Sequence, residues 1–341
     1  MVDRVKIADV AALAGVSATA VSLVLNNRPG SRLSDDVRQR VRAAAAQLDY
    51  RPNPAARSLR MGKTRTIGFV SFDVTITRYA SAIIRGALDQ AELSDHTVLI
   101  AEAGSRADQA ARAIDAMLDR RVDALVIAAM RAHQIDLPSE LPASLPVVMV
   151  NATSTDDRPS VLPDERVAGE QVAQVLIDAG HRRIAVIGVA EELRGPQRSS
   201  TVGARYDGIF AALDRAGATA VIPEVGTEWE PEVGYDVSYD LLGSTDLTGV
   251  VCLNDRLAFG LYQAASDRGI RIPEDLSVVS FDDDVVATYV RPRLTTAEIP
   301  YEAMGRAAVE MLLERSQPAG HRRVAMPLKV RDSVAQVRLA E

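Results

Sequence analysis

Residues 10–22 read VAALAGVSATAVS, and this stretch decides how the first part of the chain folds. Apolar residues recur at helical spacing over 7–14, which predicts a short helix there. Gly15 ends that helix, because glycine readily adopts the left-handed conformation that often follows a helix C-terminus. Ser17 is a favourable N-cap for a second helix that reaches about Leu25. The stretch therefore predicts two short helices joined by a tight turn.

This arrangement is typical of a helix-turn-helix, whose second helix places its N-terminal residues in the major groove of DNA. It also fits an ordinary helical hairpin, so the charge of the surrounding sequence matters. Residues 1–65 carry twelve Lys or Arg and five Asp or Glu, a net +7, so the remainder of a chain whose net charge is −7 carries −14. A small basic segment before a large acidic one favours a nucleic-acid partner for the basic segment.

The rest of the basic segment predicts two further helices. Ser34 is a favourable N-cap for a helix that reaches about Leu48, with two aspartates in its positively polarised first turn. An Asn-Pro helix start at 53–54 precedes a two-turn segment over 55–60. So short a helix is marginally stable alone, and its two arginines indicate that it becomes ordered against DNA.

From residue 66 onward, short β-branched runs alternate with helical stretches. The predicted strands are 66–71, 98–101, 124–127, 147–150, 184–187, 249–253 and 277–280, and the predicted helices include 79–93, 107–120, 165–179, 203–216 and 256–268. Such alternation is typical of parallel sheets covered by helices on both faces. The segment is too long for one compact sheet, so we predict an α/β core of two lobes, with a ligand site in the cleft at the carboxyl ends of the strands.

Composition argues against several other classes of protein. The single cysteine, Cys252, excludes an intrachain disulfide and a multi-cysteine zinc site. No run of apolar residues is long enough to span a membrane, and the first residues do not resemble a signal peptide, so we expect a cytoplasmic protein. The four histidines are scattered, and neither a phosphate-binding loop nor a nucleophile-elbow motif occurs, so we expect no enzyme, no metal and no cofactor.

Several ordered stretches resemble the LacI/GalR family of transcriptional regulators. The sequence VKIADVAALAGVSATAVSLVLNN (5–27) is similar to the DNA-binding domain of that family, and 32–70 is similar to its third helix, hinge helix and first core strand. The motifs IDAGHRRIAVIG (177–188), LNDRLAFGLYQAASDRGIRIPEDLSVVSFDD (253–283) and LTTAEIPYEAMGRAAVEMLL (294–313) are similar to the core of the family, in the same order.

The resemblance implies a helix-turn-helix head joined to a two-lobed α/β core of the periplasmic-binding-protein type. The implied domains are a DNA-binding domain over 1–52, a hinge helix and linker over 53–65, and an effector-binding and dimerisation core over 66–341. One lobe is expected to comprise about 66–162 with 292–325, and the other 163–291 with 326–341.

The resemblance also implies which residues contact DNA. Ala18 and Thr19 match positions that read base edges, and Leu59 matches a hinge leucine that enters the minor groove, although it could instead pack on the core. Leu23 stands where many members have an arginine able to bind guanine, so readout here rests on Thr19 and on apolar contact with thymine methyl groups. The full predicted DNA-contacting set is Ser17, Ala18, Thr19, Ser22, Leu23, Asn26, Arg57, Leu59 and Arg60.

An effector site between the lobes is implied as well. Two carboxylates and a guanidinium at positions that match ligand contacts suit sugar hydroxyls, but the same charges could pair with one another or cap helices. The predicted effector-binding residues are Phe72, Asp73, Arg205, Trp229, Asp255 and Asp282. Trp229, the only tryptophan, could stack on a sugar or cover an edge of the core. The stretch 73–79 departs from the Asn-Pro-Phe type common in the family, which leaves the effector open.

We therefore predict a homodimeric, sequence-specific repressor that binds a palindromic operator and is controlled by a small-molecule effector, a sugar. Two alternatives stay open: a nucleobase-type co-repressor, and DNA binding without any effector. A transport-type sugar-binding protein would share the two-lobed core, but the added head argues against it.

Overall fold

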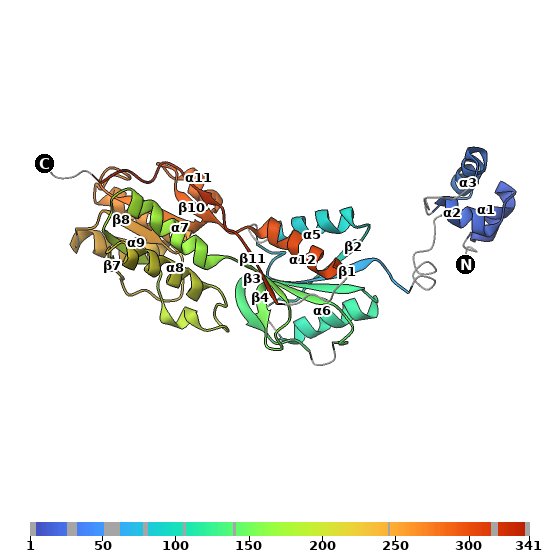
Figure 1. Ribbon diagram of the computed structural model, residues 1–341, viewed down its shortest axis with the longest axis horizontal. Coiled ribbons are helices and arrows are strands. Elements are labelled where there is room, and N and C mark those ends of the chain that lie inside the picture. Colours follow the sequence, from blue (N-terminus) through green and yellow to red (C-terminus); the bar gives the residue numbers. More distant parts are fainter. Residues whose placement is uncertain are drawn as a thin grey trace. The chain divides into compact units, whose positions relative to one another are not determined.

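The computed structural model describes residues 5–25, 33–50, 62–77, 81–104, 107–138, 141–244, 246–314 and 320–337. The chain divides into two compact units, Met1–Thr64 and Arg65–Glu341. We call the first unit the head and the second unit the core (Figure 1).

The head contains the helices α1 (Ile7–Ala14), α2 (Ala18–Leu25) and α3 (Asp35–Gln47), packed around a small cluster of valines and alanines. Gly15 has a φ of +62° and ends α1, as its sequence predicts. Arg40 of α3 donates a hydrogen bond of 3.0 Å to the carbonyl of Ala14, at the end of α1. The helix-turn-helix predicted from the sequence is therefore confirmed.

The first lobe of the core is a parallel sheet in the order β11-β5-β4-β3-β1-β2. Its strands are β1 (Thr66–Phe72), β2 (Thr97–Glu102), β3 (Ala124–Ile135), β4 (Val147–Ser154), β5 (Ser160–Pro163) and β11 (His321–Val324). The helices α5 (Ser81–Leu93) and α12 (Tyr301–Leu313) pack on one face. The helix α6 (Ala107–Asp119) covers the other face (Figure 1).

The second lobe is a sheet in the order β12-β10-β9-β8-β6-β7, parallel except for the antiparallel edge strand β12. Its strands are β6 (Arg183–Ile187), β7 (Thr219–Val221), β8 (Gly249–Cys252), β9 (Ser277–Asp282), β10 (Thr295–Glu298) and β12 (Leu328–Lys329). The helices α7 (Glu165–Asp178) and α8 (Val202–Arg215) pack on one face. The helices α9 (Pro231–Ser244), α10 (Asp255–Asp267) and α11 (Val285–Tyr289) lie on the other, and a 3-10 helix spans Glu191–Arg194.

One predicted lobe boundary is wrong. The strand β10 pairs with β9, so residues 292–298 belong to the second lobe and not to the first. The chain returns to the first lobe only at α12, because the run 295–298 finds its hydrogen-bonding partners in the second sheet. The chain thus passes between the sheets after β5, after β10 and after β11.

The two lobes also meet through backbone hydrogen bonds. The strand β3 continues past a register shift between Ala128 and His133. Within this extension, the N–H of Gln134 donates to Pro196 (2.8 Å), and the carbonyl of Ala132 accepts from Ser200 (2.6 Å). Both bonds join the first lobe to the loop that precedes α8.

Two glycines bring α7 and α8 into backbone contact. A Cβ added at Gly169 would lie 2.4 Å from the carbonyl oxygen of Arg205, and one added at Gly208 would lie 2.1 Å from that of Arg166. Each distance is too short for any side chain, so the helices can approach this closely only because both residues are glycine.

We predict that Gly208→Ala lowers the free energy of unfolding by about 1–3 kcal/mol, because the added methyl group must push α7 and α8 apart. Gly226→Ala is the matched control, since an added Cβ there meets nothing within 4 Å. Thermal unfolding of both variants measures the difference. Equal melting temperatures for the two variants would show that the helices do not need this contact.

Candidate functional site

The second helix of the head presents the predicted base-reading residues outward. Ser17, Ala18 and Thr19 are exposed at the start of α2, whereas Val21 and Val24 face the small core. Because the buried valines fix the orientation of α2, its N-terminal end is left facing the surroundings. This is the placement that a recognition helix needs.

The sequence of α2, ATAVSLVL, contains no charged residue. The Ser17 Oγ accepts a hydrogen bond of 3.2 Å from the N–H of Ala20, so this hydroxyl caps the helix and keeps its proton for another acceptor. Leu23 is partly exposed and can offer only apolar contact. Asn26, Arg57, Leu59 and Arg60 lie outside the described residues.

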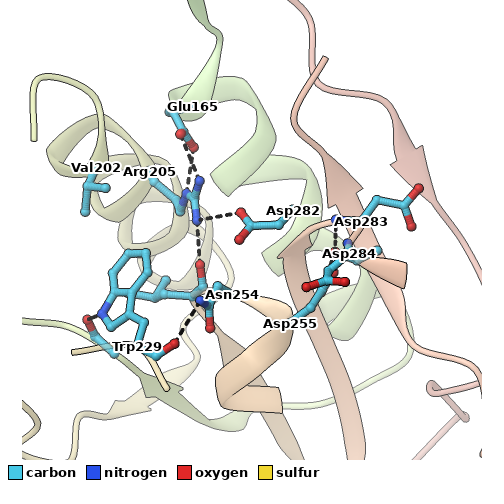
Figure 2. Close-up of polar contacts among 12 residues, drawn as sticks. Glu165, Val202, Arg205, Trp229, Asn254, Asp255, Asp282, Asp283 and Asp284 are labelled. Carbon is cyan, nitrogen blue, oxygen red and sulfur yellow. Dashed lines mark hydrogen bonds and ion pairs between the residues drawn. The ribbon is translucent and has the colours of Figure 1, made fainter. Parts of the chain in front are cut away.

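The core holds a buried ion pair between α7 and α8, the first two α-helices of the second lobe. The Arg205 Nε donates to Glu165 Oε2 at 2.6 Å and its Nη2 donates to Oε1 at 2.8 Å, while Nη1 donates to the carbonyl of Leu253 (Figure 2). Both side chains are only 3% exposed. Parallel hydrogen bonds of this kind fix both the position and the plane of the guanidinium.

Two aromatic rings lie against the same guanidinium. Its central carbon is 4.4 Å from the centre of the Phe281 ring and 5.9 Å from that of Trp229. Burial alone would lower the pKa of Arg205, but the charge and hydrogen bonds of Glu165 raise it above its usual value. Arg205 is therefore a permanently charged, immobile group.

Asp282 is the partly open member of this group. It ends the central strand β9 with a φ of +105°, and its Oδ1 lies 3.9 Å from Arg205 Nη1 (Figure 2). Its side chain is 33% exposed, in contrast to that of Arg205. Burial raises the pKa of Asp282 to about 6, against the opposing effect of Arg205. A carboxylate beside a fixed donor is a suitable pair for a hydroxyl group.

Asp255 faces a different way from Arg205. It is fully buried, its Oδ1 accepts from the Thr296 hydroxyl at 2.8 Å, and its Oδ2 accepts from the N–H of Asp284 at 2.7 Å. Burial and the charge of Asp282 raise the pKa of Asp255 well above its usual value. These contacts hold the segment that directly follows Asp282. A direct contact of Asp255 with an effector stays a prediction.

Trp229 is held in place from two sides. Its Nε1 donates to the carbonyl of Gly188 at 3.0 Å, and its own carbonyl accepts from Asn254 Nδ2 at 3.2 Å. The side chain of Asn254 also caps α10, where its Oδ1 accepts from the N–H of Leu257. The indole is half-buried and lies beside Arg205, so it is placed to respond to changes around the guanidinium.

Phe72 and Asp73 lie in the first lobe, at the carboxyl end of β1. Phe72 packs against the core of that lobe, and Asp73 has a φ of +63°. The Glu102 carboxylate organises this turn, since it accepts from the hydroxyls of Ser71 and Thr75 and from the N–H of Asp73. Burial would raise the pKa of Glu102, but these hydrogen bonds together lower it.

The structure thus brings Arg205, Asp282 and Trp229 together. Sequence reasoning missed Glu165, Phe281 and Asn254 as their neighbours. Glu165 follows β5, a four-residue strand that was not predicted, so nothing placed it beside Arg205. Among the described residues, no group of three or more His, Cys, Asp or Glu is arranged to hold a metal ion.

Over the described part of the chain, no single helix is both long and apolar enough to cross a membrane. The helices Ile7–Ala14 and Ala18–Leu25 reach that length only together, across a bend of 101°.

Comparison with known families gives two matches. Residues 6–53 match the family described as bacterial regulatory proteins, lacI family, and residues 173–334 match a periplasmic binding protein-like domain. Both matches agree with the architecture, because the first lies in the head and the second in the core.

Individual relatives match over nearly the whole length. The chain is 33% identical over 319 residues to the ribose operon repressor of Haemophilus influenzae, covering 90% of each protein. It is 32% identical to the HTH-type transcriptional repressor PurR of Erwinia tasmaniensis, covering 91% of this chain and 89% of that one. The solved lac repressor dimer bound to operator and the anti-inducer ONPF matches with a TM-score of 0.76 and 25% identity, over 98% of this chain and 100% of that chain. With a head and a core that both match, the chain belongs to the LacI family of bacterial transcriptional regulators.

Proposed function

We propose that this protein is a homodimeric repressor whose head binds a palindromic operator and whose core binds a small sugar that controls this binding. The observation that carries the proposal is the outward face of α2, with Ser17, Ala18 and Thr19 exposed on a helix that the core of the head holds in place. The relatives named as repressors and the lac repressor dimer on operator support the same reading.

The effector part of the proposal rests on Asp282, at the carboxyl end of β9, and on Arg205 of α8, whose Nη1 donates to the carbonyl of Leu253 just past the end of β8. Ligands of such folds bind at those ends, and a fixed donor beside an acceptor orients a hydroxyl group. The ribose operon repressor, by its name, acts on an operon for a sugar. Effector binding would alter how the lobes meet and so the operator affinity, a coupling of typically about 1–3 kcal/mol.

We propose a cytoplasmic protein that acts by binding alone, with no catalytic step. Hydrogen bonds or ion pairs hold the charged groups of Arg205, Asp255 and Asp282, and this suits a binding site better than a site of proton or group transfer.

An alternative is a nucleobase-type co-repressor, favoured by the similarity to PurR and by the rings of Phe281 and Trp229 beside Arg205. Flat aromatic surfaces suit a planar base as well as the apolar face of a sugar.

A ligand panel tests the effector site. Melting temperatures are measured with neutral sugars, sugar phosphates and nucleobases, because a ligand that binds only the folded state stabilises it by about 2.7 kcal/mol at a hundredfold excess over its Kd. We expect a sugar to raise the melting temperature and to change DNA binding in the same preparation. If only a nucleobase raises the melting temperature, the alternative is favoured. If none of the compounds raises it, the result contradicts an effector site.

Selection of DNA from a random duplex library tests the readout by α2. We expect a palindromic consensus with a thymine at the position that faces Leu23, since an apolar side chain can contact the thymine methyl group. Leu23→Arg should change the preferred base at that position to guanine, which should be favoured over the other bases by about 1–3 kcal/mol of binding free energy. Ile222→Arg adds the same charge at an exposed position of the core and should leave the consensus unchanged. An identical consensus from Leu23→Arg would argue against α2 as the reading helix.

The raised pKa of Asp282 predicts a pH-dependent cost in stability. Its pKa in the folded state is about 6, above the usual 3.8, so the folded protein binds this proton more tightly than the unfolded chain does. Stability therefore falls as pH rises from about 4 to above 6, and Asp282→Asn should remove this contribution. Relative to the wild type, we expect the free energy of unfolding of this variant to be higher by on the order of 1 kcal/mol above pH 6 and equal near pH 4, after allowance for the partial exposure of Asp282. Melting temperatures of both proteins across this pH range provide the test, and a constant difference would show that Asp282 does not titrate there.

A further inference from the structure

The ion pair between Glu165 and Arg205 changes what the second lobe can offer a ligand. A guanidinium has five N–H donors. Glu165 takes two of them and the carbonyl of Leu253 takes a third, so two remain. Arg205 can therefore still donate hydrogen bonds, but its charge is matched by a carboxylate at hydrogen-bond distance.

The charges close to this guanidinium do not cancel. Glu165 and Asp282 are two carboxylates against the single positive charge of Arg205, and Asp282 lies 3.9 Å from it on the more open side (Figure 2). The Asp282 carboxylate is ionised above a pH of about 6. A ligand that approaches the two free N–H groups thus meets donors and an acceptor, and a net negative charge.

We infer that Glu165 is a specificity-determining residue that restricts the effector to a neutral polyhydroxylated molecule and rejects its phosphorylated or carboxylated counterparts. The inference rests on the proposed effector site and deepens it. Discrimination of this kind works through repulsion of the wrong ligand, because placing like charges together in a buried site is costly. Glu165 acts through Arg205, since its own carboxylate is 3% exposed and already hydrogen-bonded.

The same geometry explains why Arg205 does not by itself favour an anion. An arginine without a matched carboxylate commonly binds phosphate or carboxylate in bidentate fashion. Here Glu165 occupies the Nε and Nη2 edge, one of the two edges that allow that geometry, and on the other edge Nη1 already donates to the carbonyl of Leu253. What remains is suited to single hydrogen bonds with hydroxyl oxygens, with Asp282 as the acceptor for a neighbouring hydroxyl proton.

The test uses the full-length protein and the fluorescence of Trp229, the only tryptophan of the chain, which lies beside Arg205. Two matched pairs of probes are titrated into the protein at a pH above the pKa of Asp282. The pairs are D-ribose with D-ribose 5-phosphate and D-glucose with D-glucose 6-phosphate. We expect at least one neutral sugar to bind the wild-type protein about tenfold or more tightly than its phosphate, a gap that one adverse charge interaction can supply.

Glu165→Gln keeps the size of the side chain and removes its charge. We expect this variant to bind the phosphorylated probe about tenfold more tightly than the wild type does, so that the difference in Kd between the neutral and the phosphorylated sugar becomes smaller. Glu170→Gln is the matched control, since Glu170 lies on the same helix but pairs with the surface residues Arg166 and Arg215. That control should leave the selectivity of the wild type unchanged.

The outcomes separate the two proposals. A phosphorylated probe that binds the wild type as tightly as its neutral partner overturns the role of Glu165 and leaves the effector site standing, and this result needs no variant to fold. If a folded Glu165→Gln variant keeps the wild-type difference in Kd between the neutral and the phosphorylated sugar, the role of Glu165 is overturned as well. If none of the four probes gives a saturable response, a sugar effector is contradicted, and the inference about Glu165 fails together with it.

Discussion

The arrangement of the second lobe depends on the buried ion pair between Glu165 and Arg205. A guanidinium with so little access to water is tolerated only because two carboxylate oxygens and a carbonyl satisfy three of its donors. Phe281 and Trp229 then pack against its faces. If Arg205 were lost, Glu165 would be left as an uncompensated buried charge, which typically costs about 3–5 kcal/mol. Loss of Glu165 would still leave Arg205 with Asp282 at 3.9 Å.

The partners of this pair stand on α7 and α8, which the glycines at 169 and 208 allow to lie in backbone contact. Glu165 starts α7 directly after the chain leaves the first lobe at β5. The ion pair therefore stands at a crossing between the lobes, next to the strand end that carries Asp282. A ligand bound at Arg205 and Asp282 would contact groups attached to a crossing segment, so ligand binding and lobe geometry share the same residues.

Much of this could be predicted from the sequence, and the exceptions have physical reasons. Long amphipathic helices carry a strong periodic signal, and central strands such as 124–127 and 249–252 stand out as continuous apolar runs. The strands β5, β7, β10, β11 and β12, which lie at or next to a sheet edge, have two to four residues each, too few to show a period. The lobe boundary was misplaced at one of them, β10. Arg205 and Asp282 were found through the resemblance to a family. Glu165 was missed because its partner is 40 residues away, and no local pattern connects the two.

The three passages of the chain between the sheets have a consequence for how the protein is made. Neither lobe is formed by one continuous segment of the chain. The first sheet receives its edge strand β11, and the second its edge strand β12, only from residues after 320. While the chain emerges from the ribosome, the first lobe lacks both α12 and its edge strand until nearly all of the second lobe has been synthesised. The head, in contrast, is contained in the first 64 residues and has its own core. A nascent chain thus presents a finished DNA-binding unit well before the unit that would regulate it is complete.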